Sequence, residues 1–180
     1  MLSIDNTALL VIDVQGRLAQ VMHNKETLFA NVERMIQGAK VLDLPILWSE
    51  QVPEKLGATL PEFADLLSEV SQPISKSSFS CCGAEPFMTA LTNTDCRQVL
   101  VIGIETHVCV YQTTLDLLNL DYEVQLVTDA VASRAPENKA IGLERMKEAG
   151  ATLTSTEMAL FELLRVAEGD KFRAISKLVK

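Results

Sequence analysis

Short apolar runs bounded by polar residues recur along this chain of 180 residues, and they limit the folds that it can adopt. The clearest run is residues 98–104, and another, residues 8–12, ends at Asp13. Runs of this kind are typical of strands buried on both faces of a parallel sheet. Segments with helical periodicity lie between the runs, for example residues 24–42. The alternation predicts an α/β fold, with a parallel sheet and helices on both of its faces.

The other expected elements follow the same alternation, and no Gly/Ser linker or internal repeat divides them. Strands are expected at 8–12, 45–48, 72–75, 98–104, 122–128 and 151–154. Helices are expected at 24–42 and 156–167, with Asn24 and Thr156 as N-caps, at 61–70, 85–93, 109–119 and 137–149, and from about residue 170. Loops are expected at 50–57, 77–83 and 133–136. We therefore predict one domain over residues 1–180.

Charge and cysteine content exclude several classes of protein. The net charge is −8, which disfavours nucleic acid and anionic membranes as partners. No apolar segment is long enough to span a bilayer, and we expect a cytoplasmic protein. The four cysteines show no CxxC pair, and no His cluster lies near them. We also expect no secretion signal. We expect no disulfide, no metal and no cofactor.

Ligands of open parallel sheets bind beyond the carboxyl ends of the strands, which singles out the residues that follow each expected strand. These are Asp13, Gln15, Glu50, Gln51, Lys76, Glu105, Thr106, His107, Cys109 and Asp129. Cys109 opens an expected helix directly after the central strand, where the helix N-terminus lowers the pKa of a thiol. A nearby lysine would lower it further, and an aspartate could accept the proton. Asp13, Lys76 and Cys109 thus form a candidate site, although each of them alone is an ordinary cap, surface charge or core residue.

Several segments resemble the isochorismatase-like hydrolase superfamily, in particular its isochorismatase-domain-containing branch. They are VIDVQ at 11–15, SEQVPEKLG at 49–57, Lys76 after a short strand, GIETHVCV at 103–110, DAVASR at 129–134 and TEM at 156–158. The resemblance implies a Rossmann-like three-layer sandwich with a six-stranded parallel sheet, forming a single isochorismatase-like hydrolase domain. It also implies an Asp-Lys-Cys triad on Asp13, Lys76 and Cys109. A cis peptide bond between Ile104 and Glu105 is implied as well, with backbone N–H groups of Glu105 and Cys109 turned toward a developing oxyanion.

The resemblance further implies hydrolysis of a small-molecule amide or related C–N bond through a thioester on Cys109. Asp13 would act as general base and acid, and Lys76 would stabilise the thiolate. Isochorismatase itself cleaves a vinyl ether without needing such a cysteine, so Cys109 favours the amidase-like members. The zinc-binding nicotinamidases carry an Asp-x-His pattern after the second strand, whereas this chain has Ser49-Glu50-Gln51 there. We therefore expect no metal.

Other residues near the expected strand ends are candidates for substrate contacts or for structural roles. Gln15, Gln51, Phe79 and Tyr111 are candidate substrate contacts, although Gln15 could also serve only to bridge backbone groups. We expect a structural or pocket role for His107. A side chain two residues away along a turn seldom reaches the thiol of Cys109 with a geometry that suits proton transfer. Cys81 and Cys82 are adjacent loop thiols that could form a redox switch or be inert. A homo-oligomer is expected, and helices 109–119 and 156–167 could supply either an interface or core.

Three other functions compete with hydrolysis. A non-catalytic or oligomeric scaffold could keep the fold and the triad without turnover. A nucleotide-binding protein is disfavoured, because neither GxGxxG nor GxxxxGK[ST] occurs. A thiol redox protein lacks a CxxC pair. The sequence does not identify the substrate.

Overall fold

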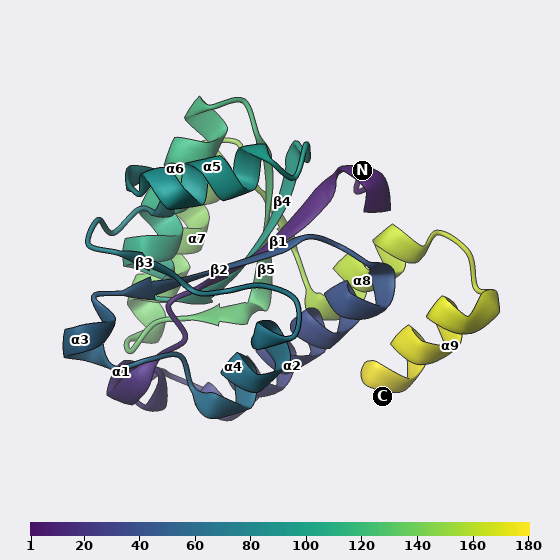
Figure 1. Ribbon diagram of the computed structural model, residues 1–180, viewed down its shortest axis with the longest axis horizontal. Coiled ribbons are helices and arrows are strands. Elements are labelled where there is room, and N and C mark those ends of the chain that lie inside the picture. Colours follow the sequence, from purple (N-terminus) through teal and green to yellow (C-terminus); the bar gives the residue numbers. More distant parts are fainter.

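A single six-stranded sheet forms the centre of the computed structural model, which describes all 180 residues (Figure 1). The strands are β1 (Thr7–Ile12), β2 (Ile46–Gln51), β3 (Ile74–Lys76), β4 (Gln98–Ile104), β5 (Glu123–Ala132) and β6 (Thr152–Thr154). They lie in the order β3-β2-β1-β4-β5-β6, and every pair is parallel. The chain builds one side of the sheet outward from β1 and then returns to build the other, so β1 and β4 are central neighbours.

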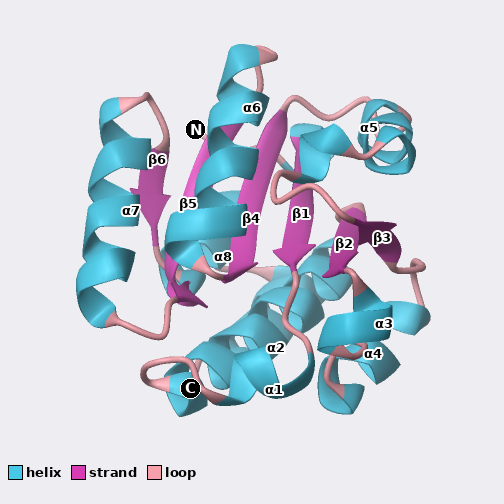
Figure 2. Cartoon of the chain, turned by 90° about the vertical axis from the view of Figure 1, so that its left-hand side faces the viewer, coloured by secondary structure: helices cyan, strands magenta, loops and turns pink.

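Helices cover both faces of this sheet (Figure 2). They are α1 (Gly16–Gln20), α2 (Lys25–Leu42), α3 (Pro53–Leu56), α4 (Pro61–Ser68), α5 (Glu85–Thr92), α6 (Tyr111–Asn119), α7 (Pro136–Glu148), α8 (Thr156–Leu164) and α9 (Gly169–Leu178). Successive residues of β1 point to opposite faces: Leu9 and Val11 join a core cluster with α2, α4, α8 and α9, while Leu10 joins another with α5, α6 and α7. The expected α/β sandwich is therefore confirmed. No helix has the length and apolarity needed to cross a membrane.

One expected helix cap is confirmed in position only, and the other is wrong. Asn24 is the N-cap residue of α2, but it has a left-handed backbone (φ 52°), and its side chain accepts no capping hydrogen bond. Ser155, not Thr156, is the N-cap of α8, and its hydroxyl accepts from the backbone N–H of Met158. Thr156 instead bonds to Asp129 through both its N–H and its hydroxyl. The choice between adjacent serine and threonine depends on tertiary partners that spacing does not reveal.

Three boundaries near the strand ends also differ from expectation. The segment expected to be a loop after the second strand holds the end of β2, and then the short helix α3. The helix expected from Cys109 is preceded by a π-helical turn, Thr106–Val110, so that Cys109 lies inside the turn. β5 continues to Ala132, which places Asp129 within the strand and not after it. Wide turns and strand extensions of this kind leave no periodic signal in the sequence.

Candidate active site

Asp13, Lys76 and Cys109 meet at the carboxyl edge of the sheet. Asp13 directly follows β1, Lys76 is the last residue of β3, and Cys109 lies in the turn after β4. After β1 the chain goes on to β2 on one side of the sheet, and after β4 it goes on to β5 on the other side. The carboxyl ends of β1 and β4 are therefore the topological switch point of the sheet. Gly103 of β4 permits this close approach: it has φ 117°, and a Cβ there would lie 2.0 Å from the carbonyl oxygen of Ile12.

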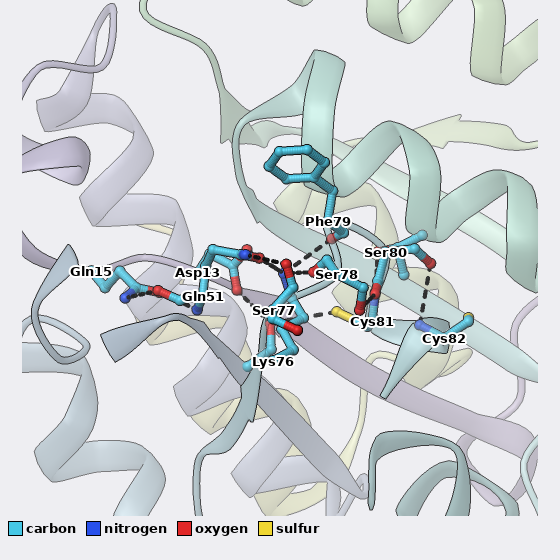
Figure 3. A network of polar contacts seen from close by, with 12 residues as sticks. Asp13, Gln15, Gln51, Lys76, Ser77, Ser78, Phe79, Ser80, Cys81 and Cys82 are labelled. Atoms are coloured by element: carbon cyan, nitrogen blue, oxygen red, sulfur yellow. Dashed lines mark hydrogen bonds and ion pairs between the residues drawn. The ribbon is translucent and has the colours of Figure 1, made fainter. Parts of the chain in front are cut away.

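Lys76 is held by a complete set of acceptors (Figure 3). Its Nζ donates to Asp13 Oδ2 at 2.8 Å and to Gln51 Oε1 at 2.6 Å. The carbonyl oxygens of Ser78 and Phe79 lie at 3.2 and 3.0 Å. The side chains of Lys76 and Asp13 are only 1% and 2% exposed. Because an ammonium group has three N–H bonds, these four acceptors leave it no free donor.

The other oxygen of Asp13 is also occupied. Ser49 donates its hydroxyl to Asp13 Oδ1 at 2.7 Å, and the thiol of Cys81 lies 3.4 Å from the same hydroxyl. Neither residue is predicted from the sequence to belong to this site. Ser49 lies in β2, which is buried throughout. A hydroxyl in such a strand needs a hydrogen-bond partner, and this was the one sign in the sequence that Ser49 has a role. A carboxylate fixed at both oxygens is held in one orientation beside the thiol of Cys109.

Cys109 is a neutral thiol in this arrangement. Burial raises its pKa well above the usual range, and the negative charge of Asp13 raises it further; the positive charge of Lys76 offsets only part of the rise. The expected lowering of the pKa is therefore wrong, because Lys76 has its hydrogen bonds elsewhere and Asp13 is the charge that dominates. The arrangement suits a thiol that gives up its proton to Asp13 during the reaction.

A small pocket opens onto Cys109. Its volume is about 100 Å³, and it is lined by Asp13, Gln15, Leu18, Gln51, Leu56, Phe79, Ile104, Glu105, Val108 and Cys109. Three of the four expected substrate contacts are thus at the pocket. Tyr111 is not: its ring packs under the guanidinium group of Arg145, 4.8 Å from the ring centroid, because α6 turns it toward α7.

Two of these pocket residues also brace the site. Gln15 accepts from the backbone N–H of Gln51 at 2.7 Å, and it donates to the carbonyl oxygens of Gln51 and Gly57. Its amide therefore ties α1 to the end of β2 and has few bonds left for a ligand. Gln51 supports Lys76 and donates to the carbonyl of Ser77. Phe79 is 53% exposed, and its ring extends away from the polar network (Figure 3).

The peptide bond between Ile104 and Glu105 is cis. Glu105 accepts hydrogen bonds from the backbone N–H and the guanidinium of Arg134, at 3.1 and 2.9 Å. Burial alone would raise the pKa of Glu105, but the bonds and charge of Arg134 outweigh it and hold that pKa below its ordinary value. The carboxylate therefore joins the ends of β4 and β5 at the rim of the site.

Comparisons with known proteins identify the family. The model of the isochorismatase domain matches residues 7–158. The chain belongs to the isochorismatase family. A secreted isochorismatase effector, Isc1 of Phytophthora sojae (strain P6497), is 37% identical over 97% of this chain and 85% of its own length. Isochorismatase domain-containing protein 2 of Xenopus laevis is 34% identical, over 97% of this chain and 83% of the relative.

Solved structures agree with this assignment. A structure described as MAR1 ribonuclease from Caenorhabditis elegans has a TM-score of 0.90 and 34% identity, covering 99% of this chain and 91% of that one. YcaC from Pseudomonas aeruginosa, determined with hexane-2,5-diol and covalent acrylamide, has a TM-score of 0.93 and 25% identity, covering 98% and 90%. The Rossmann-like architecture expected from the sequence is that of the isochorismatase-like hydrolases.

The remaining residues of this isochorismatase-family site have structural contacts. Nδ1 of His107 lies 2.9 Å from the hydroxyl of Ser133, and Nε2 faces Asn138 of α7 at 3.5 Å, so the ring is engaged by residues other than Cys109. All four cysteines are free. Burial raises the pKa of Cys81 to about 11 and that of Cys82 to about 12, and both are therefore neutral thiols.

Two further features bear on ligands. No group of three or more His, Cys, Asp or Glu side chains is arranged to hold a metal ion. A larger pocket, of about 250 Å³, lies between the start of α2, the end of β5 and α7, and includes His23, Asp129 and Lys139. It contains no cysteine and none of the triad, so the pocket at Cys109 remains the candidate active site.

Proposed function

We propose that the protein is a cysteine hydrolase that cleaves a small-molecule amide or related C–N bond through a thioester on Cys109. The observation that carries the proposal is the Asp13 carboxylate, buried, fixed by Lys76 and Ser49, and adjacent to a neutral thiol that lines a pocket. Nucleophile, base and orienting groups in such an arrangement are what covalent acyl transfer requires.

In the first half-reaction, Asp13 takes the proton of the Cys109 thiol as the sulfur attacks the carbonyl carbon. Lys76 stays on Asp13 and stabilises the thiolate through its charge. Backbone N–H groups of Glu105 and Cys109 would stabilise the oxyanion of the tetrahedral intermediate. The C–N bond then breaks, and the amine leaves with the proton from Asp13, which yields the thioester.

In the second half-reaction, Asp13 takes a proton from water as the water attacks the thioester. The carboxylic acid leaves, and the proton returns to the sulfur of Cys109. The sum is amide plus water giving acid plus amine. The YcaC neighbour was determined with covalent acrylamide, a compound that nucleophiles attack at its vinyl carbon, which supports a reactive nucleophile in a protein of the same fold.

Two alternative functions receive less support. A non-catalytic or oligomeric scaffold would not require a buried carboxylate with both oxygens bonded beside a pocket-lining thiol. Some structural neighbours are described as ribonucleases, but a net charge of −8 is unfavourable for binding a polyanion. We also propose that the protein forms a homo-oligomer and acts in the cytoplasm. Four free cysteines are consistent with a reducing compartment.

The test is a screen of small amides for release of ammonia or amine by the wild type, Cys109→Ser and Cys96→Ser. Cys96 is buried just before β4, at the end of that strand opposite to Cys109, and its substitution is the matched control for loss of a core thiol. We expect turnover that survives in Cys96→Ser and falls at least ~1,000-fold in Cys109→Ser. Turnover unaffected in Cys109→Ser would refute the proposal, and a wild type inert to every amide would favour the scaffold.

A further inference from the structure

The walls of the pocket at Cys109 are mainly apolar. Leu18, Leu56, Phe79, Ile104 and Val108 supply five of its side chains. Its volume of about 100 Å³ is well below the ~300–1,000 Å³ typical of pockets for drug-sized ligands. The group bound next to the sulfur must therefore be small and must lose most of its hydration on entry.

No free cation lines this pocket. Lys76 lies behind Asp13, and its donors are all occupied by Asp13, Gln51 and two backbone carbonyl oxygens. Arg134 holds Glu105 but does not line the pocket, and 61% of its side chain is exposed. Neither basic group is positioned to pair with a negative charge on a bound molecule.

The ionisable groups that do line the pocket, apart from the thiol, are the carboxyl groups of Asp13 and Glu105. A carboxylate on the substrate would lie near both of them, with its own hydration lost and no counter-charge gained. Burying an unpaired charge in this way is strongly unfavourable, whereas an uncharged amide of the same size loses much less on transfer.

We infer that the site selects small uncharged amides and rejects molecules with a carboxylate next to the reacting carbon. The inference rests on the proposed function for the identity of the reaction, but the selection itself is a property of the pocket. It distinguishes this protein from an enzyme for dicarboxylate substrates, which would need free arginines or lysines at the same place.

Iodoacetamide and iodoacetate provide a matched pair of probes, because they alkylate thiols by the same displacement and differ mainly in charge. The two rates are measured at Cys109 by mass spectrometry at one pH and about 0.15 M salt, where exposed charges are screened within ~8 Å. Cys82, a half-buried thiol of the same chain, is the internal reference. We expect the ratio of the iodoacetamide rate to the iodoacetate rate to be at least ~10-fold higher at Cys109 than at Cys82. Equal ratios, or a preference for iodoacetate at Cys109, would overturn the inference.

A charge placed at the pocket mouth provides the second arm. Phe79 is exposed, so Phe79→Lys adds a flexible cation without disturbing the core, and Phe79→Met controls for loss of the ring. We expect the preference for iodoacetamide at Cys109 to shrink several-fold in Phe79→Lys and to persist in Phe79→Met. If Phe79→Lys leaves the preference for iodoacetamide unchanged, the charge in the pocket does not determine that preference. Alkylation of Cys109 does not require turnover. If no amide is hydrolysed in the screen, the proposed hydrolase function is refuted, but the alkylation rates still test whether the pocket selects uncharged molecules.

Discussion

At the scale of single residues, the site depends on a charge pair removed from water. Asp13 and Lys76 are almost completely buried, and each is the other's only ionic partner. Pairs of this kind add little net stability compared with apolar residues, but loss of one partner leaves an uncompensated buried charge. Their presence is therefore explained by chemistry better than by folding.

Lys76→Ala should lower the free energy of unfolding by about 3–5 kcal/mol, because Asp13 would remain buried without a cation. Adding Asp13→Asn should restore part of this loss, since the amide is neutral and tolerates the left-handed backbone at position 13 (φ 52°). Urea denaturation of the two single variants and the double variant measures the coupling. Strictly additive losses would show that the two side chains do not interact.

Asp13 accepts from two side-chain donors, the hydroxyl of Ser49 and the ammonium group of Lys76. Ser49→Ala removes the first and should slow alkylation and hydrolysis at Cys109 about 10-fold. Ser49→Thr keeps the hydroxyl and should retain most of the rate. The rate constants of both variants are compared at matched folded fractions, determined by circular dichroism. A Ser49→Ala protein as fast as Ser49→Thr would mean that this hydrogen bond does not position the base.

The strand-end rule and the family resemblance together predicted which side chains meet at the site: Asp13, Lys76 and Cys109. They could not predict the groups behind them. The register of β2 brings the hydroxyl of Ser49 to Asp13, and a loop after β3 brings the thiol of Cys81 to that hydroxyl. The direction of the Cys109 pKa shift was also missed. It depends first on how deeply the thiol is buried and then on which charge lies nearest to it, and sequence order contains neither quantity.

At the scale of elements, the junction of β1 and β4 sets the geometry. Gly103→Ala should be strongly destabilising, because a Cβ would lie 2.0 Å from the Ile12 carbonyl oxygen at a backbone φ of 117°. Gly150 is a matched control with φ 114° and no atom within 4 Å of the Cβ position. We expect Gly150→Ala to cost about 1–3 kcal/mol from backbone strain, and Gly103→Ala at least ~2 kcal/mol more. Equal losses in urea denaturation would show that contact with β1 is unimportant.

The Glu105–Arg134 pair links the ends of β4 and β5 and should make stability depend on pH. The folded pKa of Glu105 is depressed, so the pair stabilises the fold above the unfolded pKa, and this contribution is lost as pH falls through the folded pKa. Arg134→Ala should cost about 1 kcal/mol at neutral pH, and its difference from wild type should fade as pH falls through the depressed pKa of Glu105. Arg173→Ala, which breaks an exposed pair with Asp170, should change stability by less than ~0.5 kcal/mol. A cost for Arg134→Ala that does not vary with pH would rule out this role for Glu105.

The apolar pattern of the sequence predicts some of these strands and helices but not others. Buried apolar runs located the inner strands β1, β2, β4 and β5, because burial on both faces is what a central parallel strand requires. The edge strands β3 and β6 have three residues each and are only partly buried, so the alternation of strands and helices located them. The short helices α1 and α3 were missed, since helices of 5 and 4 residues are too short for a repeating apolar face. Asp129 was placed after its strand because nothing in its neighbourhood marks that β5 continues to Ala132.

At the scale of the whole molecule, excess negative charge should separate this protein from the structural neighbours described as ribonucleases. We expect no saturable binding of a labelled single-stranded RNA in fluorescence anisotropy, even at low salt, because a net charge of −8 repels a polyanion. RNA cleavage that disappears in Cys109→Ser would contradict this expectation. Cleavage that persists in that variant would indicate a contaminating nuclease.

The strand order also has a consequence for the timing of biosynthesis. A ribosome releases Asp13, Ser49 and Lys76 before it releases Cys109, and the strand that leads to Cys109, β4, must insert beside β1 in the middle of the finished sheet. Every truncated or half-made chain that ends before β4 therefore lacks Cys109 altogether. The proposed site is completed in one step, after β4 has been made and the two halves of the sheet join.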